Sequence, residues 1–192
     1  MARLGRPRDA SIDAAVLATA RRQMANAGLA GLSIAAVADE AGTTRPTIYR
    51  RWPTKLERAV AAVADLAEVA PPEPTEDPFA DLVAELEHFR HCITDAAALA
   101  LAGVMLQDGV DPTFRSAYRA HLVRPRRARL RACLQRGVET GVLDAQADLA
   151  VAGSLMTGSW YALAIGGAPV PDDWASRVAA LVWRACGGTP PH

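Results

Sequence analysis

The 192-residue sequence is poor in aromatic side chains and carries no net charge. Only ten residues are Phe, Trp or Tyr, whereas 41 are alanine, so the hydrophobic content of 51% consists mostly of small, helix-favouring side chains. Lys and Arg balance Asp and Glu at 21 each, which excludes a disordered polyelectrolyte and a uniformly cationic nucleic-acid coat. The composition indicates an all-α protein of one large domain or two small ones.

Cysteine is also scarce, and Cys92, Cys133 and Cys186 share no Cys-x-x-Cys spacing. Their odd number argues against a disulfide framework and their spacing against a zinc cage, so we expect no metal, no cofactor and a cytoplasmic location. A signal peptide is not expected, because the first eight residues contain three arginines with no apolar run behind them.

Long uncharged runs are missing, apart from the 23 residues between Leu149 and Pro171. Only Leu149 to Ile165 can form a continuous helix, since Gly166 and Pro169 end it, and a bilayer-spanning helix needs about 20 apolar residues. We therefore expect a helix buried on nearly all sides, in a core or a subunit interface, and no membrane partner.

The sequence does contain helical periodicity on both sides of one proline-rich linker, residues 71–78. Ser33, Thr44 and the Thr54–Glu57 capping box mark helix starts, and Gly42 marks a helix end. No strand pattern is present, so the expected fold class is all-α with about nine helices. Helices are expected at about residues 10–26, 34–41, 44–52, 55–70, 79–97, 99–109, 112–121, 124–140, 147–166 and 172–186.

The two short helices around Gly42 have the spacing of a helix-turn-helix. Ala38 must be small where the helices cross, and Gly42 suits the left-handed turn between them. Ile48 then returns to a core shared with Ile34 and Val37. With Ile48 pointing inward, the opposite face of the second helix is short, basic and rich in hydrogen-bonding groups, as a DNA groove requires.

The side chains of that face suggest particular contacts with DNA. Arg45 or Arg50 can reach guanine O6 and N7, and Thr47 can meet a thymine methyl or a phosphate. Tyr49 and Lys55 can bind phosphates. The alternative is a solvated charged face. The charge distribution favours DNA, because the first 58 residues hold ten basic and five acidic side chains, against eleven and sixteen in the remainder.

The segment from Thr44 to Lys55, Thr-Arg-Pro-Thr-Ile-Tyr-Arg-Arg-Trp-Pro-Thr-Lys, resembles the DNA-binding domain of the tetracycline-repressor (TetR) family, as do the residues before it. The likeness spans about residues 9–60 and implies a DNA-binding domain at 1–53 and a helical ligand-binding and dimerisation domain at 54–192. It also implies that Trp52, where phenylalanine is usual, packs under the recognition helix. The expected DNA-binding residues, with a basic N-terminal arm, are Arg3, Arg6, Ser33, Thr43, Thr44, Arg45, Pro46, Thr47, Tyr49, Arg50 and Lys55.

The second half resembles the family more loosely, through Pro125-Arg126-Arg127 and Arg136-Gly137-Val138-Glu139. In relatives the last two long helices pair with those of a second subunit as a four-helix bundle. Two features of the sequence support this independently. A small-residue stripe formed by Ala150, Ser154, Gly158 and Ala162 permits the close approach of another helix, and the final helix carries Trp183 opposite its apolar face. The alternative is that both of these faces of the final helix are buried within one subunit. The expected dimer interface comprises Ala150, Ser154, Gly158, Ala162, Trp174, Val178, Leu181 and Val182.

A cavity for a small, largely apolar ligand is expected in the same domain, with polar groups such as Gln107, Tyr118 or His121 to orient the ligand. The alternative is that these residues form an ordinary core, because packing produces the same apolar stripes. The expected lining residues are Phe89, Cys92, Ile93, Met105, Phe114, Tyr118, His121, Met156 and Trp160.

The alternative function is a helical ligand-binding or metal-dependent enzyme, because Glu85, His88 and His91 have a Glu-x-x-His spacing that can bind a metal. A di-iron bundle needs two such motifs and the sequence has one, with no P-loop, nucleophile elbow or Rossmann fingerprint. The arginines at 124–131 are expected on a solvated face or in salt bridges between subunits, rather than on a second nucleic-acid surface.

These observations predict a homodimeric, one-component transcriptional regulator and not an enzyme. As a repressor it would bind a palindromic double-stranded DNA operator and leave it when a small-molecule effector binds.

Overall fold

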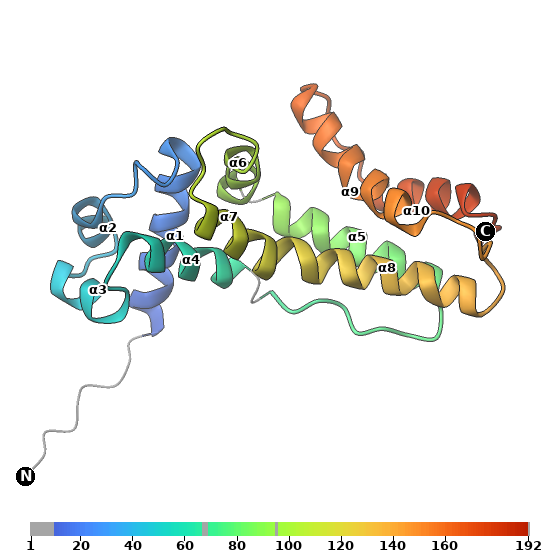
Figure 1. Ribbon diagram of the computed structural model, residues 1–192, viewed down its shortest axis with the longest axis horizontal. Helices are drawn as coiled ribbons and strands as arrows, with labels where there is room; N and C mark the ends of the chain where they lie inside the picture. The colour runs from blue at the N-terminus through green and yellow to red at the C-terminus, as the bar shows by residue number, and fades with distance from the viewer. Residues whose placement is uncertain (1–9, 67–68, 95, 192) are drawn as a thin grey trace, which may run out of the picture. The chain divides into compact units, whose positions relative to one another are not determined.

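The computed structural model describes residues 10–66, 69–94 and 96–191, and every regular element in these ranges is helical (Figure 1). The predicted all-α class is therefore confirmed. The helices form two compact units, and a π-helical segment, Arg119–Val123, follows α7 in the chain. Unit 1 contains α1 (Ala10–Ala27), α2 (Ile34–Glu40), α3 (Arg45–Arg51), α4 (Lys55–Asp65), α6 (Ala96–Val104) and α7 (Pro112–Tyr118). Unit 2 contains α5 (Pro78–Ile93), α8 (Arg124–Glu139), α9 (Leu149–Ile165) and α10 (Trp174–Ala185).

Helix α1 is the centre of unit 1 and packs against α2, α4 and α6. Ion pairs link it to three neighbours: Arg22 pairs with Glu40 of α2 at 3.0 Å, Asp13 pairs with Arg51 of α3, and Arg21 pairs with Asp65 of α4. The apolar core beneath these pairs is formed by Val16, Ala20, Met24, Val37, Ile48, Ala59, Ala62, Val63, Leu101 and Phe114.

The predicted starts of α2 and α4 and the turn after α2 are confirmed in atomic detail. The Ser33 hydroxyl accepts a bond from Ala36 N at the start of α2, and Gly42 turns the chain after α2 with φ +62°. Thr54 and Glu57 form the reciprocal capping box of α4, at 3.1 and 2.9 Å.

Thr44 differs from its prediction as a cap. It occupies the N-cap position of α3, but its side chain makes no capping hydrogen bond and lies 3.0 Å from the Thr47 hydroxyl instead. The first turn of α3 therefore keeps backbone N–H groups without a side-chain cap from Thr44.

Helices α4, α5 and α6 end earlier than predicted, and α5 ends at Ile93 rather than near residue 97. Helix α4 ends at Asp65 rather than near residue 70, and Pro71 and Pro72 follow in the chain, where proline disfavours helical conformation in the residue before it. Helix α6 ends at Val104 rather than at residue 109, and a turn through Gly109, with φ +77°, leads to α7.

In unit 2, helices α5 and α8 lie side by side, and α10 packs against both α5 and α9 (Figure 1). Two carboxylates one turn apart on α5 face arginines of α8: Asp81 pairs with Arg136 at 2.5 Å, and Glu85 pairs with Arg129 at 2.8 Å. The core between the helices includes Leu82, Leu86, Phe89, Leu130, Leu134, Met156, Trp160, Trp174, Ala179 and Trp183.

The proline-rich residues 71–77 are non-helical, as predicted, but they are held against unit 2. The backbone N–H and hydroxyl of Thr75 both donate to the buried Asp81, at 2.9 and 2.7 Å. Arg136 donates to the Thr75 carbonyl. This segment is therefore anchored by the same carboxylate that joins α5 to α8.

Candidate nucleic-acid interface and ligand site

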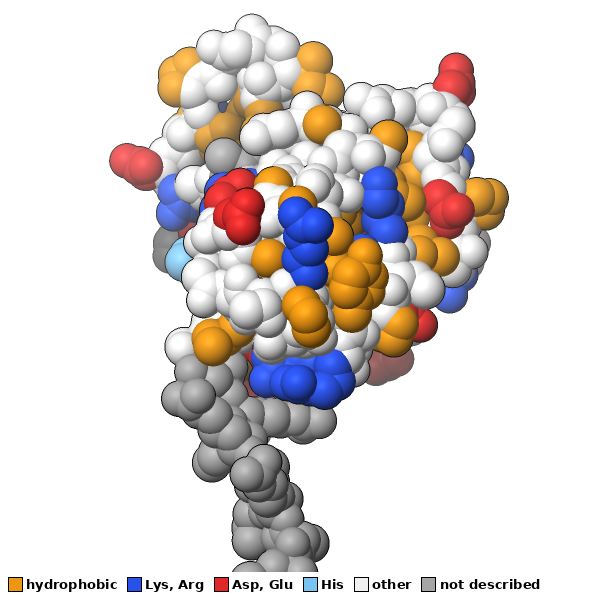
Figure 2. Space-filling view, turned by 90° about the vertical axis from the view of Figure 1, so that its left-hand side faces the viewer, with side chains coloured by type: hydrophobic (Ala, Val, Ile, Leu, Met, Phe, Trp, Pro, Cys, Tyr) orange, Lys and Arg blue, Asp and Glu red, His pale blue; other side chains and the backbone are white. Residues whose placement is uncertain are grey.

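Helix α3 has one buried residue on its inner side and a polar face that is exposed to solvent. Ile48 is buried in the core of unit 1, while Arg45, Pro46 and Arg50 are exposed and Tyr49 is 48% exposed. Figure 2 faces this side of the molecule, and Lys and Arg side chains lie across the view with hydrophobic side chains between them. The structure therefore presents the predicted DNA-contacting side chains of α3 on one accessible surface.

The arginines of α3 differ in their partners. Arg51 pairs with Asp13 of α1 and is half-buried, so its guanidinium is already neutralised within the fold. Among the described residues, Arg45 and Arg50 have no ion-pair partner, and both are exposed. These two arginines are the ones that α3 can offer to an anionic ligand.

The remaining expected contacts of unit 1 lie around this face. Ser33 and Lys55 are exposed, although the Lys55 ammonium donates to the Ala30 carbonyl at 2.8 Å. Thr43 and Thr47 are half-buried. The predicted arm residues Arg3 and Arg6 lie outside the described residues.

A buried arginine beneath this face is not in the predicted set. Arg58 of α4 is only 4% exposed, and its Nη1 donates to the Trp52 carbonyl at 2.7 Å. Its guanidinium lies 5.5 Å from the centre of the Tyr49 ring. Burial lowers the pKa of Arg58, against the nearby Tyr49 and Glu57, which raise it. The signal in the sequence is an arginine within the apolar stripe of a helix.

The expected ligand-lining residues are divided between the two units. Phe89, Cys92, Ile93, Met156 and Trp160 belong to unit 2, and Met105, Phe114, Tyr118 and His121 belong to unit 1. Within unit 2, the Phe89 and Trp160 rings meet edge to face at 6.0 Å. Within unit 1, Phe114 and Tyr118 are buried, whereas His121 is exposed.

Phe89 is the centre of an aromatic cluster that extends beyond the predicted lining residues. Tyr161 and Trp174 also contact its ring, each at 5.9 Å between ring centres. The Arg126 guanidinium lies 4.7 Å from the Phe89 ring centre, a cation–π distance. Periodicity alone could not identify Tyr161 and Arg126 as members of this cluster, because they reach Phe89 of α5 from two other helices, α9 and α8.

Two of the five α8 arginines at 124–131 correct the prediction of a solvated or intersubunit cluster. Arg126 and Arg129 are half-buried and contact Phe89 and Glu85 of their own unit. The exposed arginines of this helix are Arg124, Arg127 and Arg131, and Arg127 donates to the Ser154 hydroxyl at 2.8 Å.

The alternative metal site is not supported. Both oxygens of Glu85 accept from Arg129 Nε, at 2.8 and 2.9 Å. His88 Nε2 lies 3.7 Å from Cys92 Sγ, and burial, followed by Arg129, lowers the pKa of His88. No group of three metal-binding side chains occurs among the described residues.

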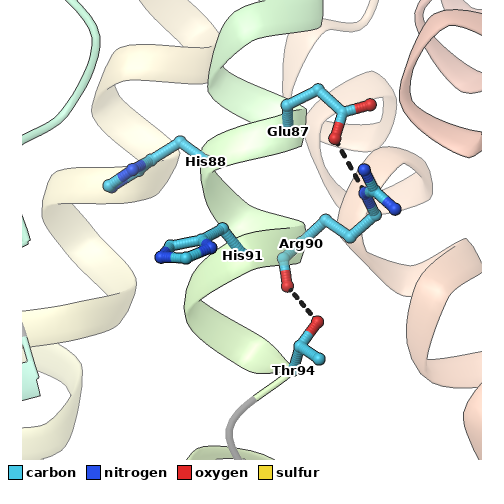
Figure 3. Close-up of a pocket in the computed structure, with 5 residues that line it drawn as sticks. All are labelled: Glu87, His88, Arg90, His91 and Thr94. Carbon is cyan, nitrogen blue, oxygen red and sulfur yellow. Dashed lines mark hydrogen bonds and ion pairs between the residues drawn. The ribbon is translucent and has the colours of Figure 1, made fainter. Parts of the chain in front are cut away.

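The histidines instead border an open hollow of about 540 Å³ along α5. Figure 3 shows His88 and His91 on one side of this helix and the Glu87–Arg90 pair on the other. His88 and His91 therefore share a side of the helix, whereas Glu85, the third residue of the metal hypothesis, is bound by Arg129 instead.

The expected dimer-interface residues fall into two groups. Ala150, Ser154, Gly158 and Ala162 of α9 are exposed, Val178 of α10 is half-buried, and Leu181 is 64% exposed. Trp174 and Val182 are buried within their own chain, and Trp174 Nε1 donates to the Ser159 hydroxyl at 3.1 Å. Trp183, predicted on the opposite side of α10, is buried as well.

This burial corrects the predicted role of Trp174 and Val182, because neither side chain lies on a surface that a second subunit can contact. Helices α5 and α9 of the same chain pack against α10, and the Trp174 ring contacts Phe89 of α5.

No helix of the described chain is both long and apolar enough to cross a bilayer.

Known proteins resemble the chain over both units. Residues 16–57 match the family described as bacterial regulatory proteins of the tetR family, and residues 72–182 match the tetracyclin repressor-like C-terminal domain. The uncharacterized HTH-type transcriptional regulator YdeS of Bacillus subtilis is 26% identical over 186 residues, covering 96% of this chain and 92% of that protein. An uncharacterized HTH-type transcriptional regulator of Mycobacterium tuberculosis is 28% identical over 133 residues, covering 69% of this chain and 65% of that protein.

Solved structures agree with these relatives. The crystal structure of a TetR family transcription regulator has 26% identity and a TM-score of 0.59, covering 94% of this chain and 100% of that one. A TetR transcriptional regulator from Agrobacterium tumefaciens has 17% identity and a TM-score of 0.67, covering 91% and 92%. Because the C-terminal match alone spans more than half of the sequence, the chain belongs to the TetR family of HTH-type transcriptional regulators, which are DNA-binding proteins and not enzymes.

Proposed function

We propose that this regulator is a cytoplasmic repressor that binds a palindromic DNA operator as a homodimer and leaves it when a small molecule binds. The observation that carries the proposal is the outward face of α3, where Arg45, Tyr49 and Arg50 are accessible while Ile48 anchors the helix in the core. An arginine side chain can form two hydrogen bonds to guanine in the major groove, and tyrosine can bind the phosphate next to it.

A second subunit fits the exposed apolar face of unit 2. Val151 and Leu155 of α9 are 53% and 57% exposed, and they lie beside the small-residue stripe that begins at Ala150. Leu181 of α10 extends the apolar surface, and α9 and α10 pack against each other. Large exposed apolar residues gathered on two adjacent helices are typical of an interface between subunits.

Dimerisation provides two copies of the recognition helix α3 for one operator. Two copies of α3 related by a twofold axis read the two halves of a palindrome in successive major grooves, about 34 Å apart. One copy of α3 has only seven residues and contacts a few base pairs, so a pair is needed for specific binding.

The effector site is proposed in unit 2, around Phe89 and its aromatic neighbours. These rings suit an apolar ligand, and the Arg126 guanidinium above Phe89 supplies a polar group that can orient it. The ligand can act only through its preference between two states of the dimer, and a coupling of about 1 to 3 kcal/mol is typical. Helix α4, which follows the DNA-binding helices in the chain, is the element proposed to transmit the effect of ligand binding to those helices.

Selection of bound sequences from a random pool of duplex DNA tests this function. The full chain is expected to enrich a palindrome whose half-sites are centred about one helical turn apart or a multiple of it. The double variant Arg45→Ala, Arg50→Ala is expected to lose the enrichment. A wild-type protein that enriches no sequence would overturn the proposal.

A further inference from the structure

Arg58 occupies a position where a charged side chain is unfavourable. It lies in the stripe of α4 that also buries Ala59, Ala62 and Val63, and it is only 4% exposed. Removing a guanidinium from water is costly, and an apolar side chain of similar size at such a position is often neutral or stabilising. Stability alone therefore does not explain an arginine at this position.

The contacts of Arg58 converge on one end of α3. Its Nη1 donates to the carbonyl of Trp52, the C-cap residue of that helix, at 2.7 Å. Its guanidinium lies 5.5 Å from the centre of the Tyr49 ring, within cation–π range. Its buried Nε has no hydrogen-bond partner among the described residues.

We propose that Arg58 is a positioning residue, which fixes the last turn of α3 and the Tyr49 side chain for contact with the DNA backbone. The proposal rests on the proposed function, because it needs α3 to bind DNA. The physical reason is that a seven-residue helix holds its own ends weakly, and the carbonyl groups of its last turn have no partner inside the helix. A cation at that end satisfies one carbonyl and interacts favourably with the helix dipole.

The Tyr49 ring is half-exposed, so without a neighbour it would sample several rotamers. The Arg58 guanidinium covers one part of the ring and restricts this motion, so that less entropy is lost when the hydroxyl binds a phosphate. Arg58 itself does not touch the ligand in this account.

A double-mutant cycle distinguishes positioning from simple packing. The variants are Arg58→Leu, Tyr49→Phe and both together, measured for melting temperature and for affinity to the duplex that the wild-type chain selects. Arg58→Leu is expected to keep or raise the melting temperature and yet lower affinity about tenfold, the size of one hydrogen bond to a charged group. In the Tyr49→Phe background the same substitution is expected to lower affinity little further.

Arg58→Lys keeps the charge but not the planar fork, so an affinity between those of wild type and Arg58→Leu is expected. If Arg58→Leu does not fold, Arg58→Lys takes its place in the cycle.

Two results would overturn the positioning role: unchanged affinity of the folded Arg58 variants, or losses that simply add to that of Tyr49→Phe. A wild-type chain that selects no duplex would instead contradict the proposed function, and an unaffected Tyr49→Phe would contradict the Tyr49 contact.

Discussion

At the residue scale, the partner of a side chain decides its role more than its chemical type does. Arg50 and Arg51 are neighbours on α3, but within the described part of the chain only Arg51 has an ion-pair partner, Asp13. Asp81 and Glu85 are one turn apart on α5, and each faces an arginine of α8. Burial raises the pKa of Glu85, and this effect is larger than the lowering caused by Arg129. Burial also acts to raise the pKa of Asp81, but the hydrogen bonds from Arg136 and Thr75 outweigh it and lower the pKa.

Arg45→Ala is expected to weaken operator binding by about 1 to 3 kcal/mol and to relax base preference at one operator position, because an exposed arginine at the start of α3 can read guanine directly. Repeating the duplex selection with this variant measures both effects. The control is Arg177→Ala, which removes an exposed arginine of α10 in unit 2 and should change neither. Undiminished discrimination by Arg45→Ala would remove this residue from base reading.

Asp81→Asn is expected to destabilise the chain by about 1 to 3 kcal/mol at neutral pH, since the buried amide cannot replace the charged bonds to Arg136 and Thr75. The lowered pKa of Asp81 means that its stabilisation is present above the ordinary aspartate pKa and is lost as the pH falls below it. The difference between wild type and variant should therefore shrink below about pH 4.

Urea unfolding at several pH values measures this difference. Glu85 titrates in both proteins, so its contribution largely cancels. A stability difference that stays constant down to pH 3 or so would show that the Asp81 charge is not what stabilises the fold.

At the element scale, short local signals were sufficient for some helix ends and insufficient for others. Ser33, Gly42 and Thr54 lie at predicted boundaries because their side chain or backbone conformation acts on the adjacent residues. The end of α6 was wrong because the apolar pattern continues past Val104, where turn bonds such as Leu106 N to Gly103 O replace the helix. A pattern of apolar residues does not indicate where such a turn closes.

Gly42→Ala should destabilise unit 1 by about 1 kcal/mol, because φ +62° is unfavourable for a residue with a Cβ although nothing within 4 Å would contact that atom. The matched control is Gly103→Ala in α6, where the space is equally open and the φ is not positive, so alanine should be neutral or stabilising. Equal unfolding midpoints for the two variants in urea would contradict the assigned turn.

At the scale of the whole molecule, contacts between residues far apart in sequence determine which apolar side chains are buried together, and sequence periodicity could not predict these contacts. The cluster around Phe89 joins α5, α9 and α10, and Arg126 reaches it from α8. Sequence periodicity identified Trp174 as apolar but not which surface covers it, so an interior residue was assigned to the subunit interface. The exposed side of α3 was easier to predict, because one turn of helix fixes which residues oppose Ile48.

Leu155→Asp is expected to convert the proposed homodimer to monomers, because a carboxylate would be buried unpaired at the proposed interface of α9. Leu106→Asp is the control, since Leu106 is 82% exposed and belongs to unit 1. Sedimentation velocity reports the oligomeric state of both variants. A dimer that persists in Leu155→Asp would place the interface on another surface.

The most direct test of DNA recognition by α3 is a fluorescence-anisotropy titration of the full chain with the selected duplex and with a scrambled duplex of the same composition, over a series of salt concentrations. The selected duplex should bind tighter by roughly a thousandfold or more, and both affinities should fall as salt rises. Equal affinity for the two duplexes would contradict sequence reading by this helix.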